Sequence, residues 1–450
     1  MNLHGLNPTP KRVFLPENGG TTRLIGHIAF EAAFSDAAET FCAYADVRLG
    51  LSFAYGAGGL SLLRDAELSP EGYRLEVRPE GVNAYASTLK GMHHAMSALL
   101  QLLTAYPDAL PLATIEDEPD CTYRGLMVDL ARQKHPLPYL LRYVDLCYDN
   151  RASHLQLHFT DDQSFTLPLD CYPLLGTEGR TYTKEEIARL VEYADKRGVE
   201  LVPEVDVPGH TVQFCKKYPE LFGTVNVLPA DEAVFEALRR IFAELCAMFP
   251  HSQMIHIGGD EAAIGNWDGC ARTQAYMKAH GIASRDEMYA EYIRIVTDDV
   301  LALGRTPVVW EGFAKEFNDR ISRDVIVIAW ESYYQPAYDL AASGFTLINC
   351  SWKPLYIVTP STHWTPEEIM DWNPWTWRHW WEKSAAYPDG YSIEMESSNV
   401  LGGQLCAWGD IIAGWEDYEK GVCEELALIE ERLPALCQRT WNLPDVLKKA

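Results

Sequence analysis

Two neighbouring carboxylic acids, Asp260 and Glu261, end an apolar run of the chain. In an unbroken strand their side chains would point to opposite faces. The preceding glycines, Gly258 and Gly259, can adopt backbone angles that direct both carboxyl groups into one pocket. Because two adjacent carboxylates do not both ionise cheaply, we expect one pKa to rise and to supply a general acid near neutral pH. An acidic loop without chemistry is the alternative.

For glycoside cleavage, the adjacency of these two acids would restrict the mechanism. An enzyme that uses one carboxyl group as the acid and another as the nucleophile holds them on opposite sides of the anomeric carbon, roughly 5–5.5 Å apart. Neighbours on one loop approach from one side. Asp260 is therefore better suited to orient or stabilise a group on the substrate than to attack it, and Asp206 and Glu311 stay open as alternative nucleophiles.

The elements that must position these acids repeat along the chain. Short apolar runs alternate with segments of helical periodicity, such as residues 184–198 and 234–249. This order predicts an α/β fold with a (β/α)8 TIM barrel, and an open doubly wound sheet is the alternative. The eight predicted strand runs are residues 124–132, 152–162, 199–210, 254–261, 306–312, 325–332, 345–352 and 400–410.

Polar and aromatic side chains gather at the ends of these runs. Active sites of such barrels lie at the C-terminal ends of the strands, whereas a purely structural barrel needs only apolar strands. The pattern therefore predicts a functional site at that end. The residues concerned are Asp161, Asp162, His210, Asp260, Glu261, Trp310, Trp330 and Trp408.

The first part of the chain has a different pattern. Strand-like runs at residues 72–86 precede a helical segment at residues 89–106, and the acidic segment 111–123 contains two prolines. We predict a small α+β domain over residues 1–115 and a catalytic (β/α)8 barrel over residues 120–450.

Six motifs in fixed order resemble those of glycoside hydrolase family 20, the β-N-acetylhexosaminidases. They are RGLMVDLAR, HLQLHFTDDQSF, VPEVDVPGHT, HIGGDE, VVWEG and GGQLCAWGD, and they span nearly the whole chain. The N-terminal part resembles the small α/β domain that precedes the barrel in that family. The resemblance implies removal of a terminal, non-reducing β-linked GlcNAc or GalNAc, with retention, from an oligosaccharide or glycoconjugate. In this family the substrate's own acetamido group attacks C1, so the two-carboxylate rule does not apply.

The same resemblance implies roles for polar residues. Glu261 matches the acid/base, and Asp260 matches the residue that orients the acetamido group and stabilises an oxazolinium-like intermediate. Arg124 matches a residue that grips sugar hydroxyls, and Asp161 and His210 match residues around the acid. Arg124 as a structural ion-pair partner and His210 as a turn cap are the alternatives. We expect Asp162 and Gln163 to act indirectly and Arg132 to be structural.

Four aromatic residues complete the predicted site. Trp310, Trp330 and Trp408 match walls that enclose the acetamido methyl group and stack on the sugar ring, although the first two could instead be core residues. Tyr356 matches a hydroxyl that holds the acetamido oxygen. Another six tryptophans gather at residues 364–381. They could form a leaving-group subsite or a partner's pocket, but packing of a long loop is the favoured interpretation.

Two positions depart from the family pattern at the end that resembles contacts to O4 and O6. Val358 stands where many relatives carry an acidic residue, and Asp410 stands where they tend to carry the longer Glu. The loss of an anion at position 358 suggests a hypothesis: the enzyme could accept or prefer a 6-sulfated sugar.

Composition narrows the remaining classes. The formal charge of −26 argues against nucleic acid or an anionic membrane surface as a partner, and no apolar run is long enough to span a bilayer. Eleven cysteines, mostly in apolar segments, and an N-terminus without an apolar signal core predict free thiols and a cytoplasmic protein. Family members often form dimers, so a homodimer is one expectation, although the sequence leaves the assembly open.

The sequence leaves three rival functions open, and we expect no metal and no cofactor. A metal-dependent hydrolase is disfavoured because His154 and His158 would lie about 13 Å apart along a strand, too far to share one ion. A non-catalytic sugar-binding barrel would not need both Asp260 and Glu261. A two-carboxylate glycosidase for sugars without an N-acetyl group is the third rival.

Overall fold

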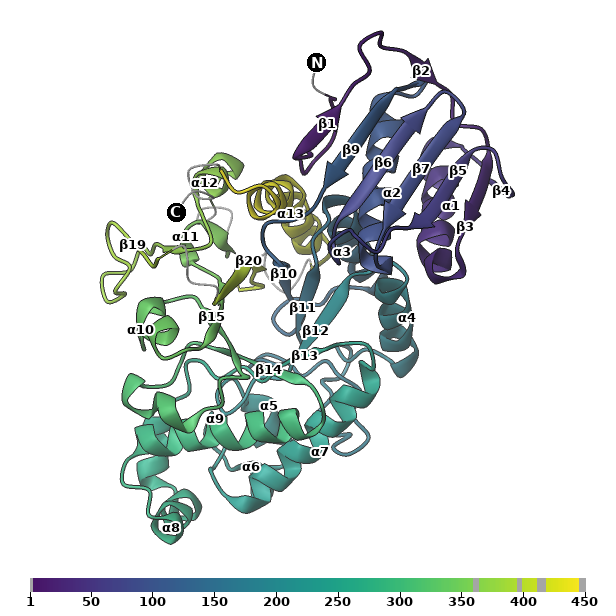
Figure 1. The fold of residues 1–450 in the computed structure, drawn as a ribbon. Coiled ribbons are helices and arrows are strands. Elements are labelled where there is room, and N and C mark those ends of the chain that lie inside the picture. Colours follow the sequence, from purple (N-terminus) through teal and green to yellow (C-terminus); the bar gives the residue numbers. More distant parts are fainter. Residues whose placement is uncertain (1–2, 359–363, 395–398, 411–417, 445–450) are drawn as a thin grey trace.

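Eight parallel strands close into a barrel in the computed structural model, which describes residues 3–358, 364–394, 399–410 and 418–444 (Figure 1). Pairing between the first and last of them closes the barrel. Each of the eight predicted runs coincides with one strand, the first of which begins one residue earlier than predicted, so the predicted (β/α)8 fold is confirmed. The strands are β10 (Tyr123–Asp129), β11 (His154–His158), β12 (Glu200–Glu204), β13 (Met254–His256), β14 (Thr306–Trp310), β15 (Ile326–Ala329), β16 (Thr346–Asn349) and β20 (Val400–Ala407). A short strand, β17 (Tyr356–Ile357), pairs with the end of β20.

Helices cover the outside of the barrel. The helix after β11 begins at a capping box formed by Thr183 and Glu186, and its apolar side is buried. The α-helices of this part are α3 (Leu137–Asn150), α4 (Lys184–Asp195), α5 (Val212–Lys217), α6 (Pro219–Phe222), α7 (Glu232–Met248), α8 (Ala271–His280), α9 (Arg285–Ala302), α10 (Ala337–Ala342), α11 (Trp352–Leu355), α12 (Pro366–Asp371) and α13 (Tyr418–Trp441). Two 3₁₀ helices, η2 (Ile264–Gly269) and η3 (Lys315–Arg320), and a small hairpin of β18 (Thr376–Trp377) and β19 (Tyr391–Ser392) complete it.

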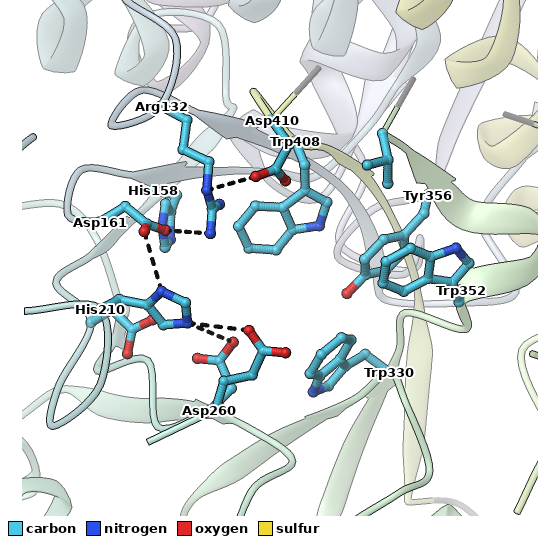
Figure 2. Close-up of a pocket in the computed structure, with 13 residues that line it drawn as sticks. Arg132, His158, Asp161, His210, Asp260, Trp330, Trp352, Tyr356, Trp408 and Asp410 are labelled. Carbon is cyan, nitrogen blue, oxygen red and sulfur yellow. Dashed lines mark hydrogen bonds and ion pairs between the residues drawn. The ribbon is translucent and has the colours of Figure 1, made fainter. Parts of the chain in front are cut away.

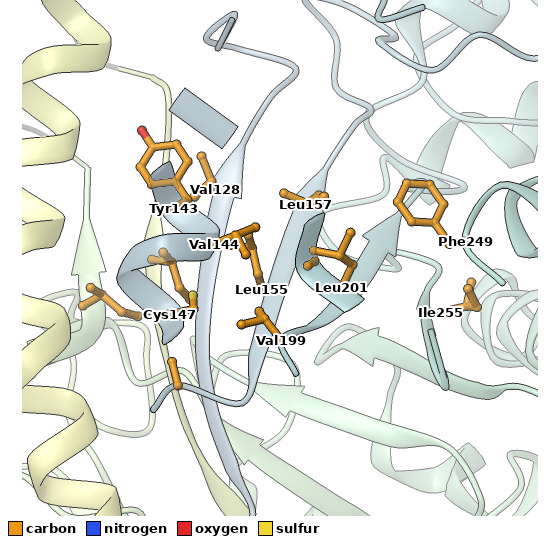
Figure 3. Close-up of a cluster of buried hydrophobic side chains, with 14 of the residues drawn as sticks. Val128, Tyr143, Val144, Cys147, Leu155, Leu157, Val199, Leu201, Phe249 and Ile255 are labelled. Atoms are coloured by element: carbon orange, nitrogen blue, oxygen red, sulfur yellow. The ribbon is translucent and has the colours of Figure 1, made fainter. Parts of the chain in front are cut away.

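Strand side chains alternate between two separate cores. Ile326 and Ile328 of β15 belong to the apolar cluster inside the barrel, whereas Val327 belongs to the cluster between strands and helices. Figure 3 shows part of the outer cluster, where Leu155 and Leu157 of β11 lie beside α3. Burial of each such side chain contributes roughly 1.5–3 kcal/mol. This alternation fixes which strand residues can reach the barrel mouth.

The N-terminal domain is a sheet with two helices. Its strands run in the order β1-β9-β6-β7-β5-β3-β4, and α2 lies against β6 and β7 and contacts α1 and α3. A separate pair is formed by β2 (Thr21–Thr22) and β8 (Leu110–Pro111). The other elements are β1 (Arg12–Phe14), β3 (His27–Phe30), η1 (Ala32–Phe34), α1 (Ser35–Leu49), β4 (Ala54–Tyr55), β5 (Leu60–Arg64), β6 (Tyr73–Arg78), β7 (Gly81–Ala86), α2 (Leu89–Ala105) and β9 (Ala113–Asp117).

Strand β9 extends two residues past the boundary at residue 115 that the sequence suggested. Asp117 occupies an inward position of the sheet, where its carboxylate accepts hydrogen bonds from the Tyr73 hydroxyl and the Lys11 amide. The acidic, proline-containing segment on which the boundary was based therefore includes the last strand of the small domain. All eleven cysteines lie in the described part and carry free thiols. Among the described helices, none combines the length and apolarity needed to cross a membrane.

Candidate active site

A pocket with a cavity volume of about 100 Å³ opens at the C-terminal ends of the barrel strands (Figure 2). Eight of the ten predicted site residues line it: Asp161, His210, Asp260, Glu261, Trp330, Tyr356, Trp408 and Asp410. Five further residues complete the lining: Arg132, His158, Asp206, Trp352 and Val358. Arg124 and Trp310 are outside it.

The backbone before the two acids is bent as the glycines predict. Gly258 and Gly259 have φ angles of 74° and 94°, and Glu261 itself has a φ of 45°. A Cβ atom on Gly258 would lie 1.8 Å from Asp206 Oδ1, so no other residue fits there. Asp260 and Glu261 consequently face the same pocket, and the positive φ of a non-glycine residue marks a strained backbone at the site.

Asp206 and Asp260 form a pair of buried acids. Asp206 accepts a hydrogen bond from the amide of Gly259 (3.1 Å), and Asp206 Oδ2 and Asp260 Oδ1 are buried without a hydrogen-bond donor among the described groups. Burial, with Asp260 nearby, raises the pKa of Asp206 well above its usual value, and burial also raises the pKa of Asp260. One proton shared by the two carboxyl groups would satisfy both orphaned oxygens.

His210 connects Asp161 to Glu261. Its Nδ1 lies 3.2 Å from Asp161 Oδ1, and its Nε2 lies 3.5 Å from Glu261 Oε2 and 3.9 Å from Asp260 Oδ2. Burial opposes protonation, but the hydrogen bonds to Asp161 and Glu261 raise the pKa of His210 well above 6.5. The imidazole is therefore a cation at neutral pH.

The pKa of Glu261 is lowered in this ligand-free site. The main cause is the hydrogen bond with His210, and the side chain is 51% exposed. The sequence correctly suggested a raised pKa in the acidic pair, but it belongs to Asp260 and not to the expected acid. Protonation of Glu261 thus needs an additional influence, and a leaving group that covers the exposed carboxyl group would supply it by excluding water.

Arg132 is the guanidinium of the pocket. Its Nη2 lies 2.7 Å from Asp161, its Nη1 lies 3.0 Å from Asp129 and its Nε lies 3.0 Å from Asp410. The expectation that Arg132 has only a structural role overlooked its position, because it follows the C-terminal end of β10. The rule that barrel sites lie at C-terminal strand ends would have selected it.

The expectation that Arg124 grips sugar hydroxyls is wrong. Arg124 lies at the opposite end of β10, is 0% exposed and forms an ion pair with Glu71 of the N-terminal domain. Its other N–H groups donate to the carbonyl oxygens of Cys121 and Arg151. The structural ion pair was the correct alternative, and its partner is Glu71.

The aromatic wall of the pocket contains Trp352 in place of the expected Trp310. Trp330, Trp408 and Tyr356 line the pocket together with Trp352, whose ring lies on Tyr356 with centroids 4.4 Å apart. Trp310 lies beneath them, 1% exposed. The prediction that Trp310 walls the pocket is thus not met, because it ends strand β14 with its side chain directed into the barrel. Trp352 ends a predicted run and could have been chosen by the same positional rule.

Three polar atoms of this wall lack regular partners. The hydroxyl of Tyr356 and the indole N–H groups of Trp352 and Trp408 are buried, and none of them makes a hydrogen bond of regular geometry within the described structure. A buried donor without an acceptor is costly unless a ligand supplies one. These groups can therefore hold a polar substituent of a bound sugar.

A polar layer supports the floor of the pocket. His158 Nε2 lies 3.0 Å from Asp161 and its Nδ1 lies 2.9 Å from Glu204, which also accepts the indole N–H of Trp310 (2.7 Å). Burial opposes protonation of His158, but Glu204 and Asp161 raise its pKa well above 6.5. This layer could not be recognised from the sequence, because His158 and Glu204 alternate with apolar residues as in an ordinary strand.

Three groups in or beside the pocket have donor atoms close enough to hold a metal ion: His158 with Glu204 and Asp206, Asp161 with Asp162 and His210, and Asp206 with His210 and Asp260. Each group includes His158 or His210. Since a metal ligand must be a neutral imidazole, the raised pKa of both histidines opposes ion binding. The donor set fits acid–base chemistry better than metal chemistry.

The tryptophan-rich segment serves mainly to pack the loop. Trp372 and Trp377 are fully buried, and their indole N–H groups donate to the carbonyl oxygens of Thr376 and Ala329. Trp380 is 54% exposed.

Glu311, one of the alternative nucleophiles, does not line the pocket, and Asp206 lies beneath Asp260 at 0% exposure.

Comparisons with known proteins agree with this geometry. Residues 121–442 match the model of the glycosyl hydrolase family 20 catalytic domain, and residues 7–118 match that of glycosyl hydrolase family 20, domain 2. A β-hexosaminidase of Akkermansia muciniphila is 30% identical over 78% of this chain and 77% of its own. One of Vibrio furnissii is 27% identical over 88% of this chain and 72% of its own. A solved structure of an exo-β-N-acetylglucosaminidase from Vibrio harveyi superimposes with a TM-score of 0.82, at 22% identity, over 99% of this chain and 74% of its own.

Proposed function

The chain belongs to glycosyl hydrolase family 20 and is a glycoside hydrolase of the β-hexosaminidase type, and from this premise we propose that it cleaves terminal β-linked N-acetylhexosamine by substrate-assisted catalysis. The observation that carries the proposal is the shared pocket of Asp260 and Glu261. Neighbouring acids on one loop suit a reaction whose nucleophile comes from the substrate itself.

In the first proposed step, the acetamido oxygen attacks C1 while Glu261 gives its proton to the glycosidic oxygen, so the bond to the leaving group breaks. Asp260 accepts a hydrogen bond from the acetamido N–H and stabilises the positive charge of the cyclic intermediate. In the second step, Glu261 removes a proton from water, whose oxygen bonds to C1. The bond between C1 and the acetamido oxygen breaks, so the ring formed in the first step opens again. The two displacements at C1 retain its configuration.

The remaining pocket residues are assigned to binding. Tyr356 would donate its hydroxyl to the acetamido oxygen, and Trp330 and Trp408 would enclose the acetamido methyl group and the sugar face. Arg132 would donate to sugar hydroxyls with the planar fork of its guanidinium.

The proposed function is tested with matched nitrophenyl glycosides. We expect turnover of the N-acetyl-β-glucosaminide and N-acetyl-β-galactosaminide, and no measurable turnover of the glucoside and galactoside that carry a 2-hydroxyl. A thiazoline that mimics the cyclic intermediate should inhibit tightly. Equal cleavage of the 2-hydroxy glycosides would favour a two-carboxylate mechanism and refute the proposal.

A 6-sulfated N-acetylglucosamine is the second candidate substrate. Val358 lines the pocket with an apolar side chain at the position where the family pattern suggests an acid, and the charge of Arg132 lies in the same lining. Removal of an anion lowers the repulsion that a sulfate would meet. We expect comparable or greater kcat/KM for the 6-sulfated aryl glycoside, and selective loss of that activity in Val358→Asp. A strong preference of the native enzyme for the plain sugar would exclude this candidate.

We infer a homodimer from the resemblance to family 20, which light scattering of the purified chain would test. The free thiols support a cytoplasmic location, and fractionation of the source cells would test it.

A further inference from the structure

Glu311 is a buried acid that binds backbone amides instead of a cation. It follows Trp310 at the end of β14 and is 0% exposed. Its Oε2 accepts the amides of Ser332 (2.9 Å) and Trp330 (3.3 Å), and its Oε1 accepts the amide of Tyr333 (2.9 Å). Within the described chain, no basic residue forms an ion pair with it. Burial raises the pKa of Glu311 to about 7, although the amides oppose this.

The amides belong to the turn at residues 330–333, which follows β15. Ser332 has a φ of 56°, a left-handed conformation that costs a non-glycine residue of order 1–3 kcal/mol. The turn is also tied to the loop after β18, since the Ser384 hydroxyl donates to the carbonyl oxygen of Glu331 and the Ala385 amide donates to that of Ser332. Such a conformation persists only where its surroundings fix it.

Trp330 is held by Glu311 at two points. Its backbone amide donates to the carboxylate, and its indole N–H donates to the Glu311 carbonyl oxygen (3.2 Å). The ring lies nearly parallel to that of Tyr356, at 11° with centroids 6.1 Å apart. Both rings line the pocket. The orientation of this wall therefore depends directly on Glu311.

We propose that Glu311 is a positioning residue, whose carboxylate fixes the turn at residues 330–333 and thereby sets the indole of Trp330 against the substrate's acetamido group. The inference rests on the proposed function. The ionised carboxylate suits this position because its two acceptor oxygens receive three amides and it carries no donor of its own. A glutamine would direct its NH₂ group toward at least one amide N–H and disturb the turn.

The test compares Glu311→Gln with a matched control, Glu244→Gln. Glu244 likewise accepts two backbone amides, those of Asp170 and Cys171, but on the outside of the barrel. We expect Glu311→Gln to lose at least about tenfold in kcat/KM, mainly in kcat, and to bind the thiazoline more weakly by a similar factor, because misplacement of a wall is felt most in the transition state. Glu244→Gln should stay within about twofold of native activity, whatever its melting temperature.

A double-mutant cycle with Trp330→Phe separates positioning from general destabilisation. If Glu311 acts through Trp330, the two losses should overlap, and the double variant should be little worse than Trp330→Phe alone. Glu311→Asp, which keeps the charge but retracts it, provides a milder second variant and should show the same pattern. Native kcat/KM in Glu311→Gln, or losses that multiply fully, would overturn the inference. Failure of the proposed function would instead appear in the native enzyme, as absent or unselective turnover of N-acetyl glycosides.

Discussion

The imidazole of His210 lies 3.5 Å from the carboxyl group of Glu261, close enough to hold the acid in its ionised form before substrate binds. The raised pKa of His210 makes this partner a cation. A substrate with a poor leaving group needs the protonated form of Glu261 as its general acid. Because the pKa of Glu261 is lowered, this form is lost at a lower pH than usual. We therefore expect kcat/KM for such a substrate to fall as pH rises through that pKa. The alkaline limb of kcat should lie at higher pH, since the bound leaving group covers the carboxyl group.

His210→Asn tests this relationship. The neutral amide removes the positive charge, so the pKa of Glu261 should rise and the alkaline limb of kcat/KM should move to higher pH, with a lower maximum. The pH dependence of kcat/KM measures both effects. Glu261→Gln, which should lose at least about 10²–10⁴-fold in rate, should lack the limb altogether. A limb at unchanged pH in His210→Asn would show that the imidazole does not tune the acid.

The pair of Asp206 and Asp260 gives a second prediction. Asp260 must be ionised to stabilise the cyclic intermediate, and its raised pKa means that this form is lost as pH falls. In Asp206→Asn the amide can donate a hydrogen bond to the ionised form of Asp260 at every pH and does not compete with it for a proton. The pKa of Asp260 should therefore fall, and the acid limb of kcat should shift to lower pH. Asp206→Leu provides no donor and should lose at least about tenfold in kcat. Identical profiles for the two variants would contradict a shared proton.

Tyr356→Phe should separate activity from stability. The hydroxyl has no regular hydrogen-bond partner in the described structure, so its removal should leave the melting temperature unchanged or raise it slightly. If the hydroxyl holds the charged intermediate, kcat/KM should fall by about 10–100-fold, which corresponds to a hydrogen bond of roughly 1.5–3 kcal/mol to a charged group. A thermal melt and steady-state kinetics measure the two effects, and a fall in stability without a fall in rate would assign the hydroxyl to the fold.

Arg124 and Arg132, which lie near opposite ends of the first barrel strand, should respond in opposite ways. Arg124→Gln leaves Glu71 without its buried partner, so we expect a loss of about 3–5 kcal/mol in the free energy of unfolding. Its KM should stay within about twofold of the native value. Arg132→Gln should reduce kcat/KM by about 10²-fold. The sugar hydroxyls lose a hydrogen-bond donor, and Asp161 and Asp410 lose the cation with which they pair. Denaturant titrations and kinetics on both proteins decide the assignment.

The sequence revealed the barrel because its strands are nearly continuous apolar runs with a helix between them. It also located the acids, since Gly258 and Gly259 allow the positive φ angles that turn both side chains into one pocket. The sequence pointed to Arg124 as the sugar contact, whereas Arg132 lines the pocket. Both residues lie in one motif, and only the direction of β10 tells which of them faces the pocket. The pairing of His158 with Glu204 joins two strands, so it depends on register, which a single sequence does not state.

The location of Arg124 has a consequence for the small domain. Glu71 meets the barrel at the base of β10, whereas the pocket opens at the other end of that strand. The N-terminal domain can therefore govern how long the enzyme survives heat or storage without altering what it cleaves. Engineering for durability and engineering for selectivity could then proceed on opposite ends of one strand, with little interference between them.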